Sequence, residues 1–291
     1  MLTALFEQVV NGTMIGSIYV LVALGMVLIF GVMQVLNFAH GVLFMAGGYV
    51  CHFAFFKLTG SYPASIALSM VALAALGLVL EQAVFRPLRD NIQMQMVASL
   101  GLILVIQNGV IALWGPHALQ MRVPTAETIV RLGSLSFTVQ HFVVIGTVAA
   151  TVILLQLFLT RSRLGTAIRA TSQNADAARV VGIDTSRIFL LTFVIASALA
   201  ALGGALLGPL FLIFPQMGDL PLLKALTAIV LGGMGSVPGA VVGGLAIGII
   251  ESVSTLFIPT DFRDTVVFGL LILVLLVRPW GLFGVRVRGE A

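Results

Sequence analysis

The side chains in this sequence that could do chemistry are few, and they lie inside long apolar stretches. Asn37 and His40 interrupt residues 8–56, a run without Asp, Glu, Lys or Arg, and Glu251 is the only formal charge within residues 225–260. Polar groups at membrane depth are costly and tend to serve ions, substrates or partners, so these three residues are candidates for a pathway or gate. The alternatives are a self-satisfied turn for Asn37 and His40, and a buried structural partner role for Glu251.

Nucleotide and metal sites are not indicated by any spacing in the sequence. A P-loop needs Gly-Lys-Ser or Gly-Lys-Thr, but neither lysine, Lys57 nor Lys224, follows a glycine. The glycine run of residues 232–239 has Pro238 where a dinucleotide fingerprint needs its last glycine, and the metal spacing His-Glu-x-x-His is absent. Cys51 is the only cysteine, so an intrachain disulfide is excluded. We expect no catalytic residues, no metal and no cofactor in this chain.

The glycine run interrupts an otherwise apolar stretch. Its sequence, GGMGSVPG, suits neither a continuous helix nor a strand, so Gly233, Gly235 and Ser236 are further pathway or gate candidates. Gly-rich interrupted segments occur near both ends of the chain, at residues 11–48 and 225–248. Broken helices expose backbone groups that only a water-filled cavity or protein burial can satisfy, so this pairing indicates a transport pathway.

Glycines four residues apart recur in the apolar stretches. Two such pairs are Gly239 with Gly243, and Gly244 with Gly248. Small residues at this spacing allow two membrane helices to approach closely, so that van der Waals contacts hold them together. We expect these four glycines to form helix contacts, either fixed ones or mobile ones between moving helices.

The composition identifies an integral membrane protein. Of 291 residues, 59% are hydrophobic and 9% are charged, and the mean hydropathy is +1.14, whereas soluble domains are about 25% charged. Most of the runs without Asp, Glu, Lys or Arg reach the roughly 20 residues that span a bilayer; they are residues 8–56, 58–80, 91–121, 132–160, 188–218, 225–250 and 265–277. We expect an all-α polytopic membrane protein, built as a single transmembrane domain over residues 1–291. It should have about eight transmembrane helices and a short or re-entrant segment at residues 222–234.

One internal segment cannot lie inside the hydrocarbon. Residues 161–187 carry five arginines against Asp176 and Asp184. Because arginine excess in short loops marks the cytoplasmic side, we expect this segment inside and residues 115–138, whose charges are balanced, outside. The net charge of +4 therefore indicates membrane orientation and does not indicate a nucleic-acid-binding surface.

Four separated motifs resemble one family. They are LNFAHG (residues 36–41, followed by Met45 and Gly47-Gly48-Tyr49), EQAVFRPLR (81–89), LGTAIRATSQNADAARVVGID (164–184) and GGMGSVPGAVVGGLAIGIIE (232–251). In type and in order they are similar to the LivH-type permease of branched-chain amino acid ABC transporters, and the resemblance covers nearly the whole chain.

The resemblance implies a permease subunit of a bacterial importer in the cell inner membrane. Its expected partners are a second, related permease, two cytoplasmic ATPase subunits that bind ATP and Mg, and an extracytoplasmic solute-binding protein. The resemblance also places a coupling helix to the ATPase at about residues 172–182. The residues there permit one: Asn174 can cap it, Ala175 and Ala178 offer a small contact surface, Asp176 and Arg179 offer charges, and Gly182 can end it. An ordinary solvated loop is the alternative.

Other functions remain open at this stage. Related permeases carry urea or short amides, since the binding protein selects the ligand. An ion-coupled secondary transporter would also use broken helices, and Glu251 would then be its coupling carboxylate. A purely structural scaffold gives no reason for two interrupted segments.

Overall fold

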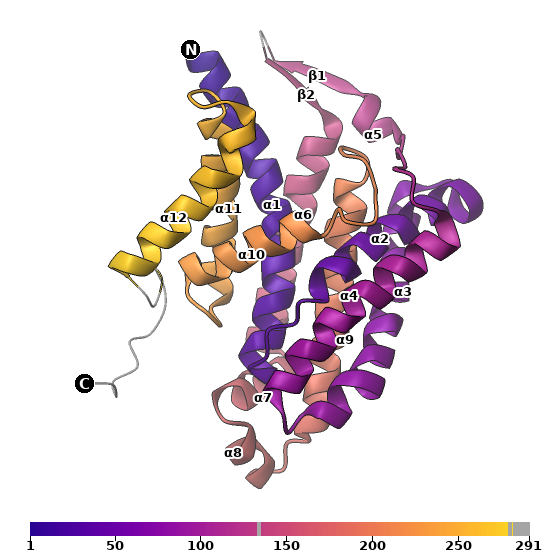
Figure 1. Ribbon diagram of the computed structural model, residues 1–291, viewed down its shortest axis with the longest axis vertical. Helices are drawn as coiled ribbons and strands as arrows, with labels where there is room; N and C mark the ends of the chain where they lie inside the picture. The colour runs from indigo at the N-terminus through magenta and orange to yellow at the C-terminus, as the bar shows by residue number, and fades with distance from the viewer. Residues whose placement is uncertain (133–134, 279–280, 282–291) are drawn as a thin grey trace.

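The computed structural model describes residues 1–132, 135–278 and 281, and almost all of this part is helical (Figure 1). The longer helices are, in chain order, α1 (Leu2–Met33), α2 (His40–Ala54), α3 (Tyr62–Leu80), α4 (Ile92–Trp114), α6 (Val139–Arg161), α7 (Arg163–Gln173), α9 (Thr185–Leu207), α10 (Asp219–Gly232), α11 (Val237–Ser254) and α12 (Arg263–Val277). The shorter elements are the π turns η1 (Phe55–Thr59) and η2 (Glu81–Phe85), the 3₁₀ turns η3 (Arg86–Leu88) and η4 (Thr260–Phe262), α5 (Pro124–Glu127), α8 (Ala175–Val180), β1 (Ile129–Leu132) and β2 (Leu135–Thr138).

Seven helices in the described residues are long and apolar enough to cross a membrane, which confirms an all-α polytopic membrane protein. The sequence predicts about eight transmembrane helices, and these seven agree with that approximate number. Helix α10, with 14 residues, is the short segment that the sequence predicts. Helix α12, the expected last passage, has 15 residues, fewer than the roughly 20 that a full passage needs, because charges at Arg263 and Arg278 bracket its apolar run.

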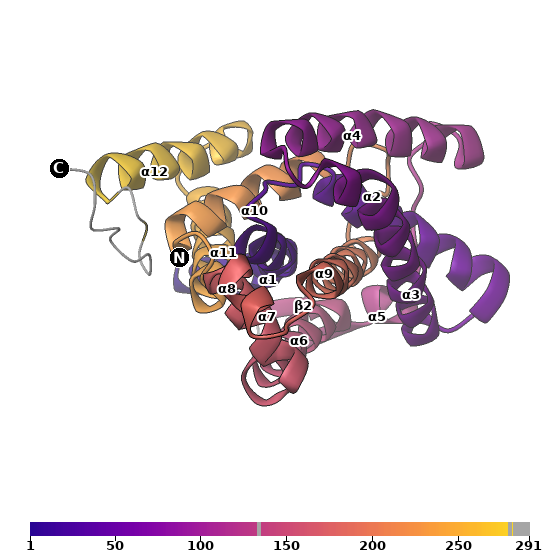
Figure 2. The same cartoon turned by 90° about the horizontal axis from the view of Figure 1, so that it is seen from below.

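Helix α1 lies in the middle of the bundle. Seen from below, α9, α10, α11 and α6 surround it (Figure 2). Within its apolar window 83% of the residues are buried, against 11% for α4, whose apolar side chains face outward and are available to lipid. A helix that is apolar all round belongs in the interior of a bundle, and α1 takes that position.

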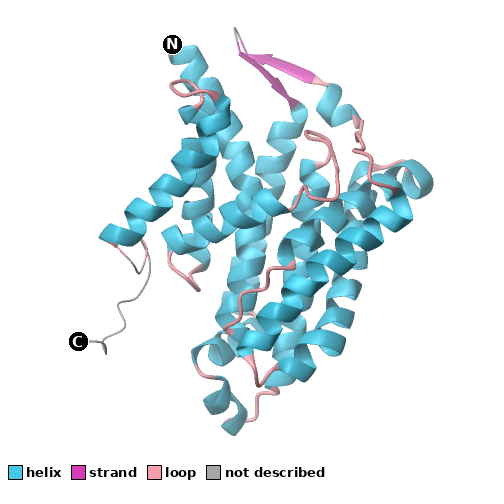
Figure 3. Ribbon diagram, in the orientation of Figure 1, coloured by secondary structure: helices cyan, strands magenta, loops and turns pink. Residues whose placement is uncertain are grey.

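The chain leaves the helical conformation between α1 and α2. Residues 34–39 form a loop that rises from the lower end of α1 to the start of α2, part way up the bundle (Figure 3). Gln34 begins it with φ +54°, the only positive φ of a non-glycine residue in the described part. The backbone of this loop is tied to side chains, because the Ser99 hydroxyl oxygen on α4 accepts from Phe38 N at 3.2 Å.

A second break separates α10 from α11. Helix α10 runs obliquely across α1, and α11 then returns along α1, with which it packs extensively (Figure 1). The turn between them needs φ +100° at Gly233 and +85° at Gly235, values that glycine adopts without steric cost. The Ser236 side chain caps α11 by accepting from Gly239 N at 3.1 Å.

The two ends of the bundle differ in structure. The antiparallel hairpin of β1 and β2, which pairs Ile129 with Thr138, lies at the same end as the amino terminus, called here the outer end (Figure 1). The sequence did not predict this hairpin. Helices α7 and α8 lie at the opposite, inner end, and they contain Arg163, Arg169 and Arg179 of the arginine-rich segment.

Candidate functional site

A charged cluster is buried where α1, α10, α11 and α12 meet. Lys224 Nζ on α10 lies 2.6 Å from Glu251 Oε1 on α11, and the two side chains are only 2% and 4% exposed. The Tyr19 hydroxyl on α1 donates to Glu251 Oε2 at 2.8 Å. Both oxygens of this carboxylate are therefore occupied, which favours the buried structural partner role for Glu251.

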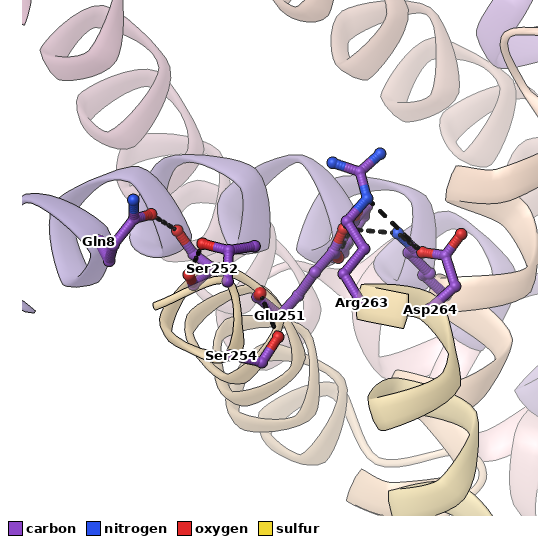
Figure 4. Close-up of polar contacts among 9 residues, drawn as sticks. Gln8, Glu251, Ser252, Ser254, Arg263 and Asp264 are labelled. Atoms are coloured by element: carbon purple, nitrogen blue, oxygen red, sulfur yellow. Dashed lines mark hydrogen bonds and ion pairs between the residues drawn. The ribbon is translucent and has the colours of Figure 1, made fainter. Parts of the chain in front are cut away.

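The cluster extends to the start of α12. Lys224 Nζ also lies 2.8 Å from Asp264 Oδ1, and Arg263 Nε lies 3.6 Å from Glu251 Oε1 (Figure 4). Two cations balance two carboxylates, so the group is neutral as a whole. This neutrality matters because removing one partner of a buried pair leaves an uncompensated charge, at a cost of roughly 3–5 kcal/mol.

Two adjoining cavities meet at this cluster. The first, called here the outer cavity, has a volume of about 320 Å³ and a mixed polar and apolar lining. The second, called here the inner cavity, has a volume of about 230 Å³ and a largely apolar lining. The first is lined by Gln8, Asn11, Met14, Ile15, His141, Leu210, Phe211, Glu251, Ser252, Thr255 and Arg263. The second is lined by Ile15, Ile18, Tyr19, Leu207, Phe211, Leu212, Phe214, Met217, Leu220, Pro221, Lys224, Glu251 and Arg263. Glu251 and Arg263 thus belong to both cavities.

The predicted glycine contacts hold α11 between two helices. Gly243 lies against the backbone of Ala228 on α10, and Gly239 lies against Gly232 at the end of the same helix. On its other side, α11 meets α1: Gly244 lies against Val20 and Gly248 against Gly16. A Cβ atom at any of these four glycines would collide with the neighbouring helix. The glycines therefore set how closely α10 and α1 approach the charged cluster.

The polar residues of the first break lie away from that cluster. Asn37 Oδ1 accepts from Ala39 N at 3.0 Å, as in a turn that satisfies its own backbone. His40 is fully buried at the start of α2, where its ring occupies the space that Gly25 of α1 leaves open. In this conformation His40 packs between helices and does not line either of the two cavities described above.

The candidates in the second break act as turn residues. Gly233 and Gly235 supply the positive φ values, and Ser236 supplies the cap of α11. Their contacts explain how α10 ends and how α11 begins.

The arginine-rich segment contains the short helix that the sequence permits. Helix α8 covers Ala175–Val180, and Asn174 Oδ1 caps it by accepting from Asp176 N at 3.0 Å and Ala177 N at 2.9 Å. Gly182, with φ +86°, follows its end. Arg179 Nε donates to Thr185 Oγ1 at 2.8 Å, which connects α8 directly to the start of α9.

One residue of the expected contact surface faces the wrong way for that role. Ala178 is 3% exposed, because α8 turns this side toward the bundle. The exposed side carries Asp176, Ala177, Val180 and Val181, and the last two are 87% and 76% exposed. The surface available to a partner therefore includes two exposed apolar side chains, Val180 and Val181. Ala178 packs against the rest of the bundle instead.

A polar cavity of about 330 Å³ lies between the first break and the part of the chain where α7 ends and α8 begins. It is lined by Val32, Met33, Gln34, Thr171, Ser172, Gln173, Asn174, Ala175, Asp176 and Phe189. The start of α8 thus faces the end of α1 across this cavity.

A second buried charge pair was missed in the sequence. Arg89 donates to Glu81, which is fully buried, and Arg89 Nη1 also donates to Ser186 Oγ at 2.8 Å. The same guanidinium lies 4.8 Å from the ring centre of Phe189. This contact ties the connection between α3 and α4 to the first turns of α9, which follows α8 in the chain. The available signal was an acidic and a basic residue eight positions apart at the end of an apolar run.

The residues of the larger cluster were also missed, apart from Glu251. Lys224, Arg263 and Asp264 appear in the sequence only as charges that bound apolar runs, and Tyr19 is a single hydroxyl inside the first run. A lysine next to a helical apolar run, with one lone carboxylate in the following run, was the signal that could have suggested their pairing.

Comparison with known proteins agrees with the resemblance seen in the motifs. The family described as branched-chain amino acid transport system / permease component matches residues 8–275. The chain is 36% identical to the high-affinity branched-chain amino acid transport system permease protein BraD of Pseudomonas aeruginosa and to the corresponding LivH of Escherichia coli strain K12, over 96% of this chain and 95% of each relative. It is 31% identical to the probable LivH of Methanocaldococcus jannaschii, over 96% of this chain and 93% of that protein. No solved structure matches the chain. The chain therefore belongs to the family of branched-chain amino acid transport permease components.

Proposed function

We propose that this chain is the transmembrane permease subunit of an ATP-driven importer, and that it forms part of the pathway for branched-chain or related amino acids. An extracytoplasmic solute-binding protein delivers the substrate. A second homologous permease completes the pathway, and two cytoplasmic ATPase subunits bind ATP and Mg. The complex lies in the bacterial inner membrane.

The observation that carries this proposal is the match over nearly the whole chain to permeases named for branched-chain amino acid transport. The geometry supports it in two places. Cavities with charged and apolar walls lie between α1, α11 and α12. At the opposite end, α8 presents Val180 and Val181 to solvent, as a surface that docks onto another protein would.

Coupling through α8 follows from its contacts. A helix of six residues is too short to be stable alone, so its order comes from the Asn174 cap and from packing on α7 and α9. A partner that displaces α8 pulls on α9 through Arg179 and Thr185. Since Arg89 holds Ser186 and Phe189, the same displacement reaches the connection between α3 and α4.

Two other functions compete with this one. A permease of the same family for urea or short amides would have the same fold and the same coupling segment. An ion-coupled secondary transporter would need a carboxylate that exchanges its partners, but Glu251 is held by Lys224 and Tyr19. The paired state of Glu251 makes the ion-coupled alternative the weaker one.

Transport by the assembled complex in liposomes tests the proposal. We expect uptake of leucine that requires ATP inside, the binding protein outside and no ion gradient. Urea, offered with the same binding protein, should not be taken up. Leucine uptake that is driven by an ion gradient in the absence of ATP would contradict the proposal. Uptake of urea without uptake of leucine would indicate a permease for urea or short amides.

A further inference from the structure

Arg263 lies at the junction of the two cavities, and the two terminal nitrogens of its guanidinium are available as hydrogen-bond donors. Only its Nε takes part in the charged cluster, 3.6 Å from Glu251 and 3.9 Å from Asp264. Within the described residues, no hydrogen bond or ion pair reaches its two terminal nitrogens, which point away from the cluster (Figure 4). The side chain is 41% exposed. An arginine with a free planar fork is suited to hold a carboxylate through two parallel hydrogen bonds.

The other members of the cluster keep their contacts when the terminal nitrogens of Arg263 bind a ligand. Lys224 keeps both Glu251, at 2.6 Å, and Asp264, at 2.8 Å, and Tyr19 keeps its hydrogen bond to Glu251. Two carboxylates around one ammonium leave one negative charge, which Arg263 balances and which holds its side chain in place. A zwitterionic ligand brings an ammonium together with its carboxylate, so it adds no net charge to this neutral cluster.

The two cavities beside Arg263 offer different chemical groups, and together these groups favour one class of ligand. The inner cavity has aliphatic and aromatic walls that include Ile18, Leu207 and Phe214, and its volume of about 230 Å³ is below the roughly 300–1,000 Å³ of sites for drug-sized ligands. The outer cavity offers amide and hydroxyl oxygens from Gln8, Asn11 and Thr255, which can accept from an ammonium group. A small ligand with a carboxylate, an ammonium and an aliphatic chain meets a matching group on each wall.

We propose that Arg263 binds the carboxylate of a zwitterionic aliphatic amino acid, with the aliphatic chain in the inner cavity and the ammonium toward the outer one. This inference rests on the proposed function, because it names the place in the pathway where that substrate is held. It makes Arg263 a substrate-binding residue and leaves Lys224 and Glu251 as the groups that position it.

Protection of a cysteine in the inner cavity tests the proposal without requiring transport. Leu220 lines this cavity and is 46% exposed, so Leu220→Cys in a Cys51→Ala background gives a reporter for a small thiol reagent in the assembled complex. We expect excess leucine to slow the labelling at least threefold. Leucinamide, which lacks the carboxylate, should not slow it. Thr166→Cys, at an exposed position of α7 at the other end of the bundle and outside α8, is the control whose labelling should not respond to leucine.

Substitution of the arginine completes the test. With Arg263→Gln the protection by leucine should disappear, and Arg263→Lys should keep part of it. Labelling that does not respond to leucine, equal protection by leucinamide, or full protection in Arg263→Gln would each overturn the proposal. The comparison of leucine with leucinamide needs no change at Arg263, so it decides the question even where the Gln variant does not assemble. If leucine protects the cysteine but is not taken up, the proposed function fails and the binding site is supported. If leucine is taken up but does not protect the cysteine, the binding site fails and the proposed function is supported.

Discussion

Lys224 Nζ lies 2.6 Å from Glu251 Oε1, and this ion pair joins α10 to α11 across the glycine break that separates them. The turn at residues 233–236 makes the pair possible, because it folds α11 back beside α10. Gly243 then allows the two helices to touch at Ala228. The break and the ion pair form one unit: the turn sets the angle between the helices, and the pair fixes it.

This relationship predicts an asymmetry between single and double substitutions. Lys224→Met leaves the buried Glu251 and the partly buried Asp264 without their shared cation, so it should destabilise the complex by roughly 3–5 kcal/mol. The double variant Lys224→Met with Glu251→Met leaves Arg263 and Asp264, which lie 3.9 Å apart and balance each other. Thermal unfolding of the purified complex should therefore show the double variant to be more stable than the single one. Lys57→Met, at an exposed lysine, is the control and should change little. If the double variant is no more stable than Lys224→Met, then Lys224 is not the main partner of Glu251.

The contact between α10 and α11 predicts a steric effect at Gly243. A leucine there collides with the backbone of Ala228, and overpacking of this kind costs typically about 1–3 kcal/mol. Gly243→Leu should lower both the thermal stability and the uptake rate. Gly146→Leu on α6 has no atom within 4 Å of its Cβ and is the matched control. If both variants have the same thermal stability and the same uptake rate, Gly243 does not lie in a close helix contact.

The exposed valines of α8 predict a defect in coupling without a defect in folding. Val180 is 87% exposed, so Val180→Asp should leave the permease inserted and folded. It should weaken co-purification of the ATPase or separate ATP hydrolysis from uptake. Ala178→Arg should instead destabilise the permease itself, since Ala178 is buried. Arg163→Ala, outside α8, should be mild. Normal uptake and normal ATPase binding in Val180→Asp would show that this face of α8 is not the docking surface.

The orientation predicted from the arginines can be tested on α7, outside the proposed docking surface. Thr166→Cys in a Cys51→Ala background should not react with an impermeant thiol reagent added to intact cells. Glu127→Cys, exposed in α5 at the outer end, should react. Both reactions should occur once the membrane is permeabilised. The reverse pattern in intact cells would invert the topology, and with it the assignment of the inner and outer ends.

Several features of this protein were determined by short stretches of sequence. The length of the apolar runs gave the membrane helices, because about 20 apolar residues are needed wherever a helix crosses the bilayer. The boundaries of α8 followed from Asn174 and Gly182, since a cap and a residue with positive φ act on their immediate neighbours. The break between α10 and α11 followed from the glycine run in the same way.

The charged cluster was decided only by the tertiary structure. Tyr19, Lys224, Glu251 and Asp264 come from four helices, and their meeting depends on how each helix is rotated. Helices such as α1 are apolar all round, so periodicity does not mark the face that turns inward. The same limit applies to Ala178, whose burial depends on how α8 rests on the bundle. The rotation is set by close contacts between distant residues, such as Gly248 with Gly16, and no local pattern in the sequence contains that information.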